Sequence, residues 1–407
     1  MTRAMLAILA LASAGAAAAK TSGDDVYCAA LATALDATAP GGPAFLRSYQ
    51  PGPEDKDLPG PLRLSAFSYD NALAATAFVA CGDIPRARRI ADAFLQAIEH
   101  DRTHDPVRLR NAYRSGPVEG GEAKLPGWWD AEKSQWLEDA YQDGTATGNA
   151  AWVALALLNV NQAAHDARYL ATARRLLEWI DDVPRRAALR GGYAGGVSGY
   201  DGQQETLHWE STEHNVDVAA AASWAHRLTG NVRLEGMADR ASAFVAARFE
   251  SALGRFAIGT KADGTNGDAN QVALDSQVWP ILGVPNAPQE WGRAVEYAYA
   301  NLRSGDGMTF TTGGENQWTE GSAQTSLSLH ALRNDAESRG LLASIAPNAG
   351  PSGLVYATDK GEARTGLNVE SKGGGEFKYY HRPHVGATAW AAIATEHWNP
   401  FTGERIP

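Results

Sequence analysis

Acidic side chains gather at the start of one alanine-rich segment of this sequence. The stretch WESTEHNVDVAAAA, residues 209–222, holds Glu210, Glu213 and Asp217 just before a run without charge. Spacings of three and four residues predict that all three lie on one face of a helix. Like charges this close destabilise one another, so one carboxyl should keep its proton near neutral pH. The pattern fits a site that uses a neutral acid beside ionised ones.

Helix capping does not account for this cluster. Ser211 or Thr212 can already cap the helix that follows, which leaves Glu213 and Asp217 without a capping task. A structural network in which an arginine pairs with the carboxylates is the competing interpretation.

A carboxylic acid facing a carboxylate is the arrangement that cleaves glycosidic bonds, because one protonates the leaving oxygen while the other activates water or attacks the sugar. Residues one helical turn apart lie about 5–6 Å apart, less than the about 6.5–9.5 Å of an inverting pair. We therefore expect Glu213, the general acid, to have its partner on another helix. Asp70 in FSYDNA and Glu320 in NQWTEGSAQ are the candidate bases. The predicted catalytic set is Glu213, Asp70, Glu320 and Asp217.

Aromatic and polar side chains near these acids form the predicted substrate-binding set. Flat amphipathic rings beside polar groups suit the faces of sugars. The alternatives are core packing for any one tryptophan and simple helix capping for Asp275. The predicted substrate-binding residues are Trp209, His214, Trp128, Trp129, Trp318, Tyr380, His384 and Asp275.

The candidate acids open a recurring pair of helices. In each pair an almost wholly apolar helix is followed, after a short turn, by an amphipathic one. The pairs span residues 69–98, 147–180, 213–249, 275–302 and 320–346, with a sixth apolar helix at 385–398. The amphipathic segment at 24–37 supplies the missing sixth partner. Buried and half-buried helices in alternation predict an all-α fold, an (α/α)6 toroid of six inner and six outer helices with long loops at one face.

Two cysteines, Cys28 and Cys81, are the only ones in the sequence. In the toroid, Cys28 lies near the start of an outer helix and Cys81 near the end of the neighbouring inner helix, at the same end of the barrel. We expect a disulfide between them, with two buried free thiols as the alternative.

The bulk properties indicate an exported protein. Residues 1–19 read as a signal peptide, with Arg3, an apolar stretch and the cleavage pattern Ala17-Ala18-Ala19. We therefore expect a periplasmic or secreted monomer without a membrane anchor, formed by one catalytic domain at 20–407. Two domains divided near residue 185 are the alternative. The net charge of −11 argues against nucleic acid and anionic lipid as partners.

Other catalytic motifs are missing from the sequence. There is no H-E-x-x-H, no paired-cysteine zinc pattern and no phosphate-binding loop. We expect no cofactor and no metal, and a polysaccharide or oligosaccharide as the substrate.

Five phrases of this sequence carry a family resemblance: FSYDNALAATAFVACGD, TGNAAWVALALL, HWESTEHNVD, LDSQVW and ENQWTEGSAQ. With the helix pattern, they make the chain resemble the six-hairpin glycosidase superfamily, whose (α/α)6 barrels act on polysaccharides. The resemblance implies an active site at the mouth where the inner helices begin, with acids performing hydrolysis. It carries over no individual catalytic residue. A glycoside hydrolase is the predicted function.

Two other functions stay open from the sequence. The stretch KYYHRPH, residues 378–384, offers a base and charge-neutralising groups for a polysaccharide lyase, namely Tyr379, Tyr380, His381, Arg382 and His384. An ordinary loop against the last helix explains the same stretch. A sugar epimerase-like or non-catalytic glycan-binding toroid is the third hypothesis.

Overall fold

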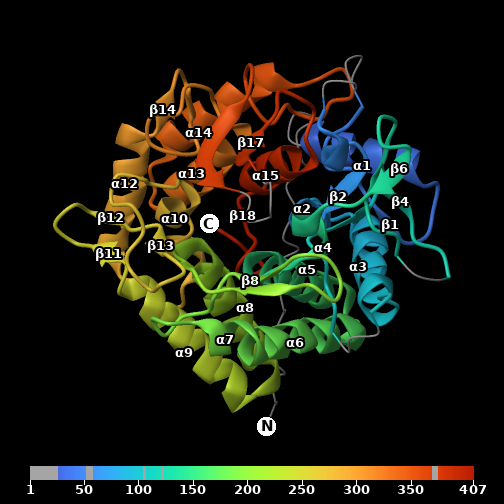
Figure 1. The fold of residues 1–407 in the computed structure, drawn as a ribbon. Coiled ribbons are helices and arrows are strands. Elements are labelled where there is room, and N and C mark those ends of the chain that lie inside the picture. The colour runs from blue at the N-terminus through green and yellow to red at the C-terminus, as the bar shows by residue number, and fades with distance from the viewer. Residues whose placement is uncertain (1–25, 52–57, 104–106, 121–122, 369–374) are drawn as a thin grey trace, which may run out of the picture.

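Two concentric rings of helices form the body of the protein, as the computed structural model shows (Figure 1). The described residues are 26–51, 58–103, 107–120, 123–368 and 375–407. The predicted signal peptide at 1–19 lies outside them, and a single domain at 20–407 stays a prediction. Within the described residues, no helix is both long enough and apolar enough to cross a bilayer.

The predicted toroid is confirmed. The inner ring consists of α2 (Ser68–Ala80), α5 (Thr147–Ala164), α8 (Thr212–Thr229), α10 (Asp275–Val278) continued by α11 (Pro280–Gly283), α13 (Thr319–Ala331) and α15 (Val385–Thr395). The outer ring consists of α1 (Val26–Thr38), α3 (Ile84–Glu99), α6 (Ala167–Asp182), α9 (Val232–Ala246), α12 (Gly292–Asn301) and α14 (Asp335–Ile345).

Local sequence explains both kinds of helix. In α2 every residue except Tyr69 is buried, as expected of a helix with no polar face. In α3 the Asp83 side chain accepts a hydrogen bond from the Arg86 amide and caps the helix. The fourth inner helix is divided because Pro280 cannot continue the hydrogen-bonding of a helix interior.

The two ends of the chain close the ring. The last inner helix, α15, contacts both α2 and the N-terminal helix α1. Helix α1 is therefore the outer partner of α15. Cys28 of α1 and Cys81, which ends α2, form a disulfide with their Cα atoms 6.2 Å apart.

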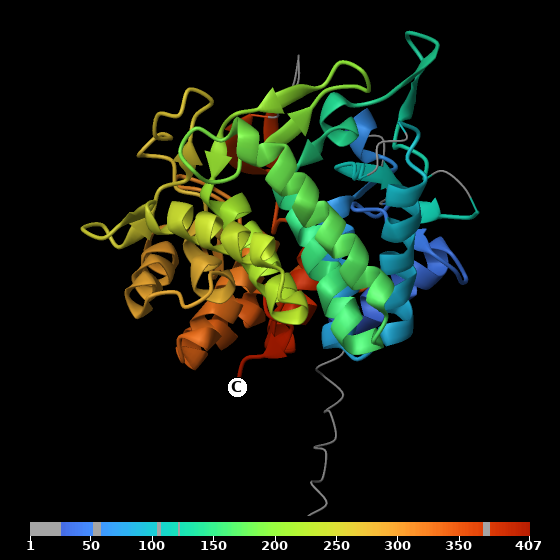
Figure 2. The ribbon, with the colours of Figure 1, turned by 90° about the horizontal axis from the view of Figure 1, so that it is seen from below.

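The loops between the helices contain short strands. Figure 2 shows most of these strands at one end of the rings, opposite the C-terminus. Among the described residues every sheet has two strands except the three-stranded β7–β8–β9. The strands are β1 (Ala44–Phe45), β2 (Ser65–Phe67), β3 (Ala112–Arg114), β4 (Gly116–Pro117), β5 (Trp128–Asp130), β6 (Gln135–Leu137), β7 (Thr145–Ala146), β8 (Gly196–Ser198), β9 (Glu205–Leu207), β10 (Glu210–Ser211), β11 (Phe249–Glu250), β12 (Arg255–Phe256), β13 (Gly259–Thr260), β14 (Arg303–Ser304), β15 (Gly307–Met308), β16 (Ala363–Asn368), β17 (Glu376–Tyr379), β18 (Trp398–Asn399) and β19 (Glu404–Arg405). Short helices complete the loops: η2 (Gly60–Leu62), α4 (Ala140–Asp143), α7 (Pro184–Ala187), η3 (Gln289–Trp291) and η4 (Ala346–Asn348).

Removing the disulfide should lower stability measurably. Its cysteines are 53 residues apart in sequence, and a closed loop of that length stabilises a fold by about 4 kcal/mol. We expect the double variant Cys28→Ser/Cys81→Ser to lose about that free energy of unfolding in urea. Reductant should lower the urea midpoint of the wild type and leave that of the variant unchanged. Equal midpoints for the two proteins without reductant would contradict the prediction.

Candidate active site

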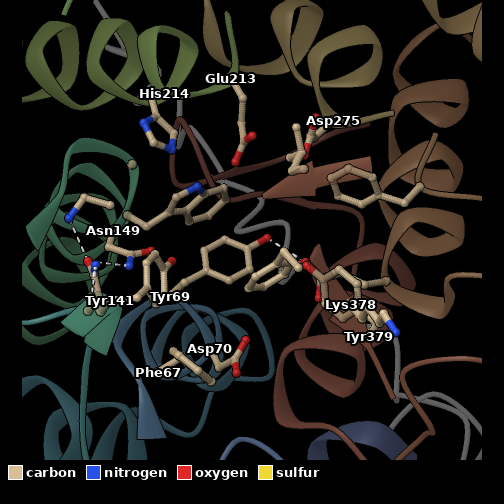
Figure 3. Close-up of a pocket in the computed structure, with 18 of the residues that line it drawn as sticks. Phe67, Tyr69, Asp70, Tyr141, Asn149, Glu213, His214, Asp275, Lys378 and Tyr379 are labelled. Atoms are coloured by element: carbon tan, nitrogen blue, oxygen red, sulfur yellow. Dashed lines mark hydrogen bonds between the residues drawn. The ribbon is translucent and has the colours of Figure 1, made fainter. Parts of the chain in front are cut away.

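One cavity of about 250 Å³ opens where the inner helices begin (Figure 3). The six inner helices each contribute a polar residue from their start to its wall. These residues are Asp70, Asn149, Glu213, Asp275, Glu320 and His384. The toroid therefore brings together side chains that are separated by up to 314 positions in the sequence, as the numbering of Asp70 and His384 shows.

Glu213 is the protonated member of a carboxyl pair. It lies in the first turn of α8, which Ser211 caps by accepting a hydrogen bond from the His214 amide. Burial, followed by the charges of Asp275 and Asp217, raises the pKa of Glu213 well above its usual value. Burial also raises the pKa of Asp275, to about 6, although the Ser276 amide donates to its Oδ1 at 2.6 Å. Near neutral pH the proton therefore resides on Glu213, beside an ionised Asp275.

A second group of polar side chains faces this pair. Figure 3 shows Glu213 and Asp70 on opposite sides of the cavity with Tyr69 between them. His384 Nε2 lies 3.2 Å from Asp70 Oδ2, and both residues are buried. His384 Nδ1 accepts a hydrogen bond from the Ala387 amide at 3.2 Å. Burial lowers the pKa of His384, but the charge of Asp70 and its hydrogen bond outweigh burial and raise that pKa. Nε2 therefore carries a proton and donates it to Asp70.

Glu320 completes this second group. Its Oε1 accepts a hydrogen bond from the Tyr69 hydroxyl at 2.7 Å, and that hydroxyl accepts one from Trp390 Nε1 at 2.9 Å. Its Oε2 has no hydrogen-bond partner among the described residues. Burial raises the pKa of Glu320 to about 8, against the opposing effects of His384 and the Tyr69 hydroxyl. One oxygen is thus held in place while the other stays available for a proton.

A glycine makes room for the Asp70, Glu320 and His384 cluster. A Cβ on Gly386 would lie 2.5 Å from Asp70 Oδ1 and 3.1 Å from Glu320 Oε2. One ligand atom from each of the three cluster residues lies within 4.8 Å of the others, a spacing compatible with a metal ion. Because His384 already uses both ring nitrogens within the protein, hydrogen bonding alone accounts for the arrangement.

Aromatic rings form the walls and the floor of the cavity. Trp209 packs against His214 with ring centres 5.2 Å apart, and Trp318 packs against Tyr379 at 5.1 Å. The cavity is lined at its apolar end by Trp152 and Trp279, which contact each other at 5.2 Å, and Phe401 packs against Trp152 at 5.1 Å. These rings fill the centre of the toroid. The cavity is therefore closed at that end and does not continue as a channel.

His214 presents a neutral imidazole to the cavity. Burial lowers the pKa of His214 to about 4. The neighbouring helix approaches it closely, because a Cβ on Gly148 would lie 2.4 Å from His214 Cδ2. A neutral ring held in this way is suited to hydrogen bonding with a hydroxyl group.

The structure brings eight of the predicted site residues to the cavity wall. They are Asp70, Glu213, Glu320, Asp275, Trp209, His214, Trp318 and His384. Four others lie outside the wall: Asp217, Trp128, Trp129 and Tyr380.

Each of these four has a structural reason for its place. Asp217 lies one helical turn after Glu213 and is fully buried, where burial and Asp275 raise its pKa well above the usual value. Trp128 and Trp129 stand on a separate hairpin, β5–β6. Tyr380 lies just beyond the end of β17, and its ring packs against Tyr49 with ring centres 6.0 Å apart.

The expectation that Glu210 shares a helix face with Glu213 is wrong. Helix α8 begins at Thr212, so Glu210 belongs to strand β10. Its buried carboxylate accepts hydrogen bonds from the amides of Leu189, Arg190 and Gly192. Glu210 anchors a mouth loop.

Sequence reasoning missed several residues of the wall. The sequence does not indicate Tyr69 as a site residue, because Tyr69 directly precedes Asp70 and neighbouring positions of a helix point in different directions. Asn111 lies in a loop, where its Oδ1 accepts hydrogen bonds from the Asn149 side chain at 2.8 Å and the Ala146 amide at 2.7 Å. The Y–D pair at 69–70 in the first turn of α2 is the signal that could have found Tyr69, whereas no sequence pattern marks Asn111.

Comparison with solved structures identifies the fold. A glycosidase variant in complex with glucose matches with a TM-score of 0.61 and 15% identity, over 91% of this chain and 95% of that one. The chain has the fold of the (α/α)6 glycosidases. An α-mannanase of glycoside hydrolase family 76 from Bacteroides thetaiotaomicron matches at 0.58 and 13% identity, over 91% and 95% of the two chains. A cellobiose 2-epimerase from Bacillus thermoamylovorans matches at 0.58 and 11%, over 90% and 97%.

The resemblance to six-hairpin glycosidases is thereby confirmed at the level of the fold. No protein-family model matches the sequence, and no curated protein matches it either. At these identities the solved structures establish the architecture alone.

The interaction between the Glu213 and Asp275 carboxyl groups can be tested without a substrate. Because the Asp275 charge raises the pKa of Glu213, Asp275→Asn should lower the pKa of Glu213. We expect this shift in ¹³C NMR titrations of protein labelled at the glutamate carboxyl carbons. The Glu213 resonance is identified by its loss in Glu213→Gln. An unchanged or higher pKa of Glu213 in the Asp275→Asn variant would show that the two carboxyls do not interact.

Proposed function

We propose that this protein is a glycoside hydrolase that cleaves a polysaccharide or oligosaccharide by acid and base catalysis. One observation supports the proposal above all. Glu213, whose pKa is raised, faces Asp70 across a cavity walled by aromatic rings (Figure 3). Glu320 lies beside Asp70. Glycosidic cleavage requires this pairing of an acid with a carboxylate across the scissile bond.

In the proposed reaction Glu213 gives its proton to the glycosidic oxygen as the bond from that oxygen to the anomeric carbon breaks. A water molecule attacks the anomeric carbon and loses its proton to Glu320. This step needs the ionised form of Glu320, so the rate should rise as the pH increases through the Glu320 pKa of about 8. Of the two candidate bases we favour Glu320, since its Oε2 has no hydrogen-bond partner within the described part of the chain, whereas Asp70 accepts a hydrogen bond from His384. Asp70 and His384 then act by positioning, and Asp217 has no direct role because it lies outside the cavity wall.

The charges of the cavity argue against the lyase hypothesis. A lyase must neutralise the carboxylate of a uronate. Among the described residues that line the cavity, Lys378 is the one lysine or arginine, and its Nζ binds Glu362 at 2.8 Å. His381 lies outside the wall, with its Nδ1 2.7 Å from the Thr358 carbonyl oxygen. A cavity lined by four carboxyl groups favours a neutral sugar over an anionic one.

We also propose that the protein acts after export, in the periplasm or outside the cell, as a monomer. The stretch at 1–19 has the pattern of a cleavable signal peptide. The Cys28–Cys81 disulfide suits an oxidising compartment. The net charge of −11 supports the absence of nucleic acid partners.

Replacing the proposed acid or the proposed base should slow hydrolysis strongly. We expect Glu213→Gln and Glu320→Gln each to lower kcat/KM by roughly 10²–10⁴, the usual contribution of general acid or base catalysis. The measurement is reducing sugar released from a panel of α-mannan, pullulan, dextran and mixed-linkage β-glucan, with product analysis. Full rates in both variants on a glycan that the wild type cleaves would refute the assignment.

The hydrogen bond from Tyr69 to Glu320 should affect the pH dependence of kcat/KM. The Tyr69 hydroxyl favours the ionised form of Glu320, so its loss in Tyr69→Phe should raise the pKa of Glu320. A net hydrogen bond of about 1 kcal/mol corresponds to roughly one pKa unit. Because the base must be ionised, the acid limb of kcat/KM should move to higher pH by that amount.

The matched control for this experiment is Tyr141→Phe, since Tyr141 also lines the cavity and no hydrogen bond joins it to Glu320. The acid limb of that variant should keep its position. A melting curve for each variant separates the titration from a loss of folded protein. A Tyr69→Phe limb that stays in place or moves to lower pH would exclude Glu320 as the base.

A further inference from the structure

Two large aromatic rings stand in solvent on a hairpin at the mouth. In the β5–β6 hairpin Trp129 pairs with Trp136 and Trp128 pairs with Leu137. Residues directly opposite on antiparallel strands share a face, so Trp129 and Trp136 project from the same side. Their exposed fractions are 58% and 44%. Trp128, on the other side, packs over Gly60, where an added Cβ would lie 2.6 Å from its ring.

The protein holds these rings in a fixed arrangement. The Arg114 guanidinium lies 4.8 Å from the Trp136 ring centre. Gly127 lets the backbone approach the same ring, because an added Cβ would lie 2.2 Å from Trp136 Nε1. At the tip, Asp130 Oδ1 accepts hydrogen bonds from the Glu132 and Lys133 amides. The hairpin is therefore braced at its base and at its turn.

The hairpin is continuous with the rim of the cavity. It contacts η2, whose last residue, Leu62, lines the cavity. It leads directly into α4, whose Tyr141 also lines the cavity. Figure 2 shows this region of the chain projecting from the end at which most strands gather.

We propose that Trp129 and Trp136 form a sugar-binding platform for the part of a polysaccharide chain that lies outside the cavity. The proposal rests on the proposed function for the chemistry of its ligand. The cavity of about 250 Å³ ends at the Trp152 and Trp279 floor, so a chain longer than a few sugars must leave through the mouth. Neighbouring indole rings offer flat amphipathic faces for stacking on successive sugar rings.

The surroundings of the platform favour a sugar over a protein. Charged side chains share a surface pocket with Trp136, namely Arg102, Lys124 and Glu138. Arg102 and Glu138 form an ion pair at 3.0 Å. A stable protein interface buries about 800 Å² on each partner, far more than two rings provide. Exposed tryptophan beside charged groups is the chemistry that carbohydrate recognition uses.

Binding measured in a catalytically inactive background tests the platform. The parent is Glu213→Gln, and the variants add Trp129→Ala, Trp136→Ala or both. Affinity electrophoresis in gels containing α-mannan, pullulan, dextran or mixed-linkage β-glucan gives the dissociation constant for each glycan. We expect the parent to be retarded by at least one glycan, and the double variant to bind that glycan about tenfold more weakly or worse.

Two further variants keep the result interpretable. Leu228→Ala removes a comparably exposed apolar side chain, 47% exposed, from the last turns of α8, and should bind like the parent. Trp129→Tyr keeps an aromatic face and should retain most of the affinity lost in Trp129→Ala. Circular dichroism and melting curves establish that each variant is folded.

The outcomes separate the platform from the proposed hydrolase. Equal retardation of the parent and the double variant, or no retardation of the parent by any glycan, would overturn the platform whatever the hydrolysis assays give. Tryptophan-dependent retardation supports the platform even where no glycan in the panel is hydrolysed, and in that case the proposed hydrolase alone fails.

Discussion

Burial of carboxyl groups at the first turns of the inner helices is the constraint on which this structure depends. Taking a carboxylate out of water is costly, and the positive end of a helix offsets only part of that cost. In the toroid this free-energy cost arises at four residues that surround one cavity, namely Glu213, Asp275, Glu320 and Asp70. The consequence is a raised pKa at both Glu213 and Glu320. Glu213 can then act as an acid, whereas Glu320 can act as a base only where it is ionised. Hydrogen bonds from the Ser276 amide and the Tyr69 hydroxyl hold one oxygen of Asp275 and one oxygen of Glu320 as acceptors.

Ring geometry and small side chains make this convergence possible. Inner helices such as α8 and α15 are rich in alanine, so their backbones approach one another closely. Six such helices leave a central space that aromatic rings fill from one end. The remaining space lies at the starts of the helices, where the polar residues are. The same topology therefore explains both the solid core and the open site.

The fold was predictable because helix periodicity is a local property of the sequence. The apolar inner helices and the amphipathic outer ones are visible in the residues themselves, and topology alone then places Asp70, Glu213 and Glu320 at one mouth. Positions that depend on loops were not predictable in this way. The predicted helix includes Glu210, but helix α8 begins two residues later, at Thr212. The Glu210 carboxylate therefore binds the loop at 189–192 and does not face the cavity.

Loop side chains also escaped sequence reasoning. Trp128 and Trp129 lie on a hairpin outside the cavity wall, and only the register of β5 with β6 shows that Trp129 faces solvent and Trp128 faces the protein. Both Tyr379 and Tyr380 are candidates from the sequence, and only the structure shows that Tyr379 lines the cavity while Tyr380 does not. Tyr69 and Asn111 act through partners more than 30 positions away, and no local pattern reports such contacts.

Phe401, which packs against Trp152 beneath the cavity, makes the site depend on contacts between distant segments. Closure of the ring has the same dependence, because α15 packs against α1. Helix pairs such as α5 with α6 are formed by neighbouring segments, whereas the floor and the closure are not. Contacts between segments far apart in sequence slow folding. The cavity is therefore complete only after both distant contacts have formed.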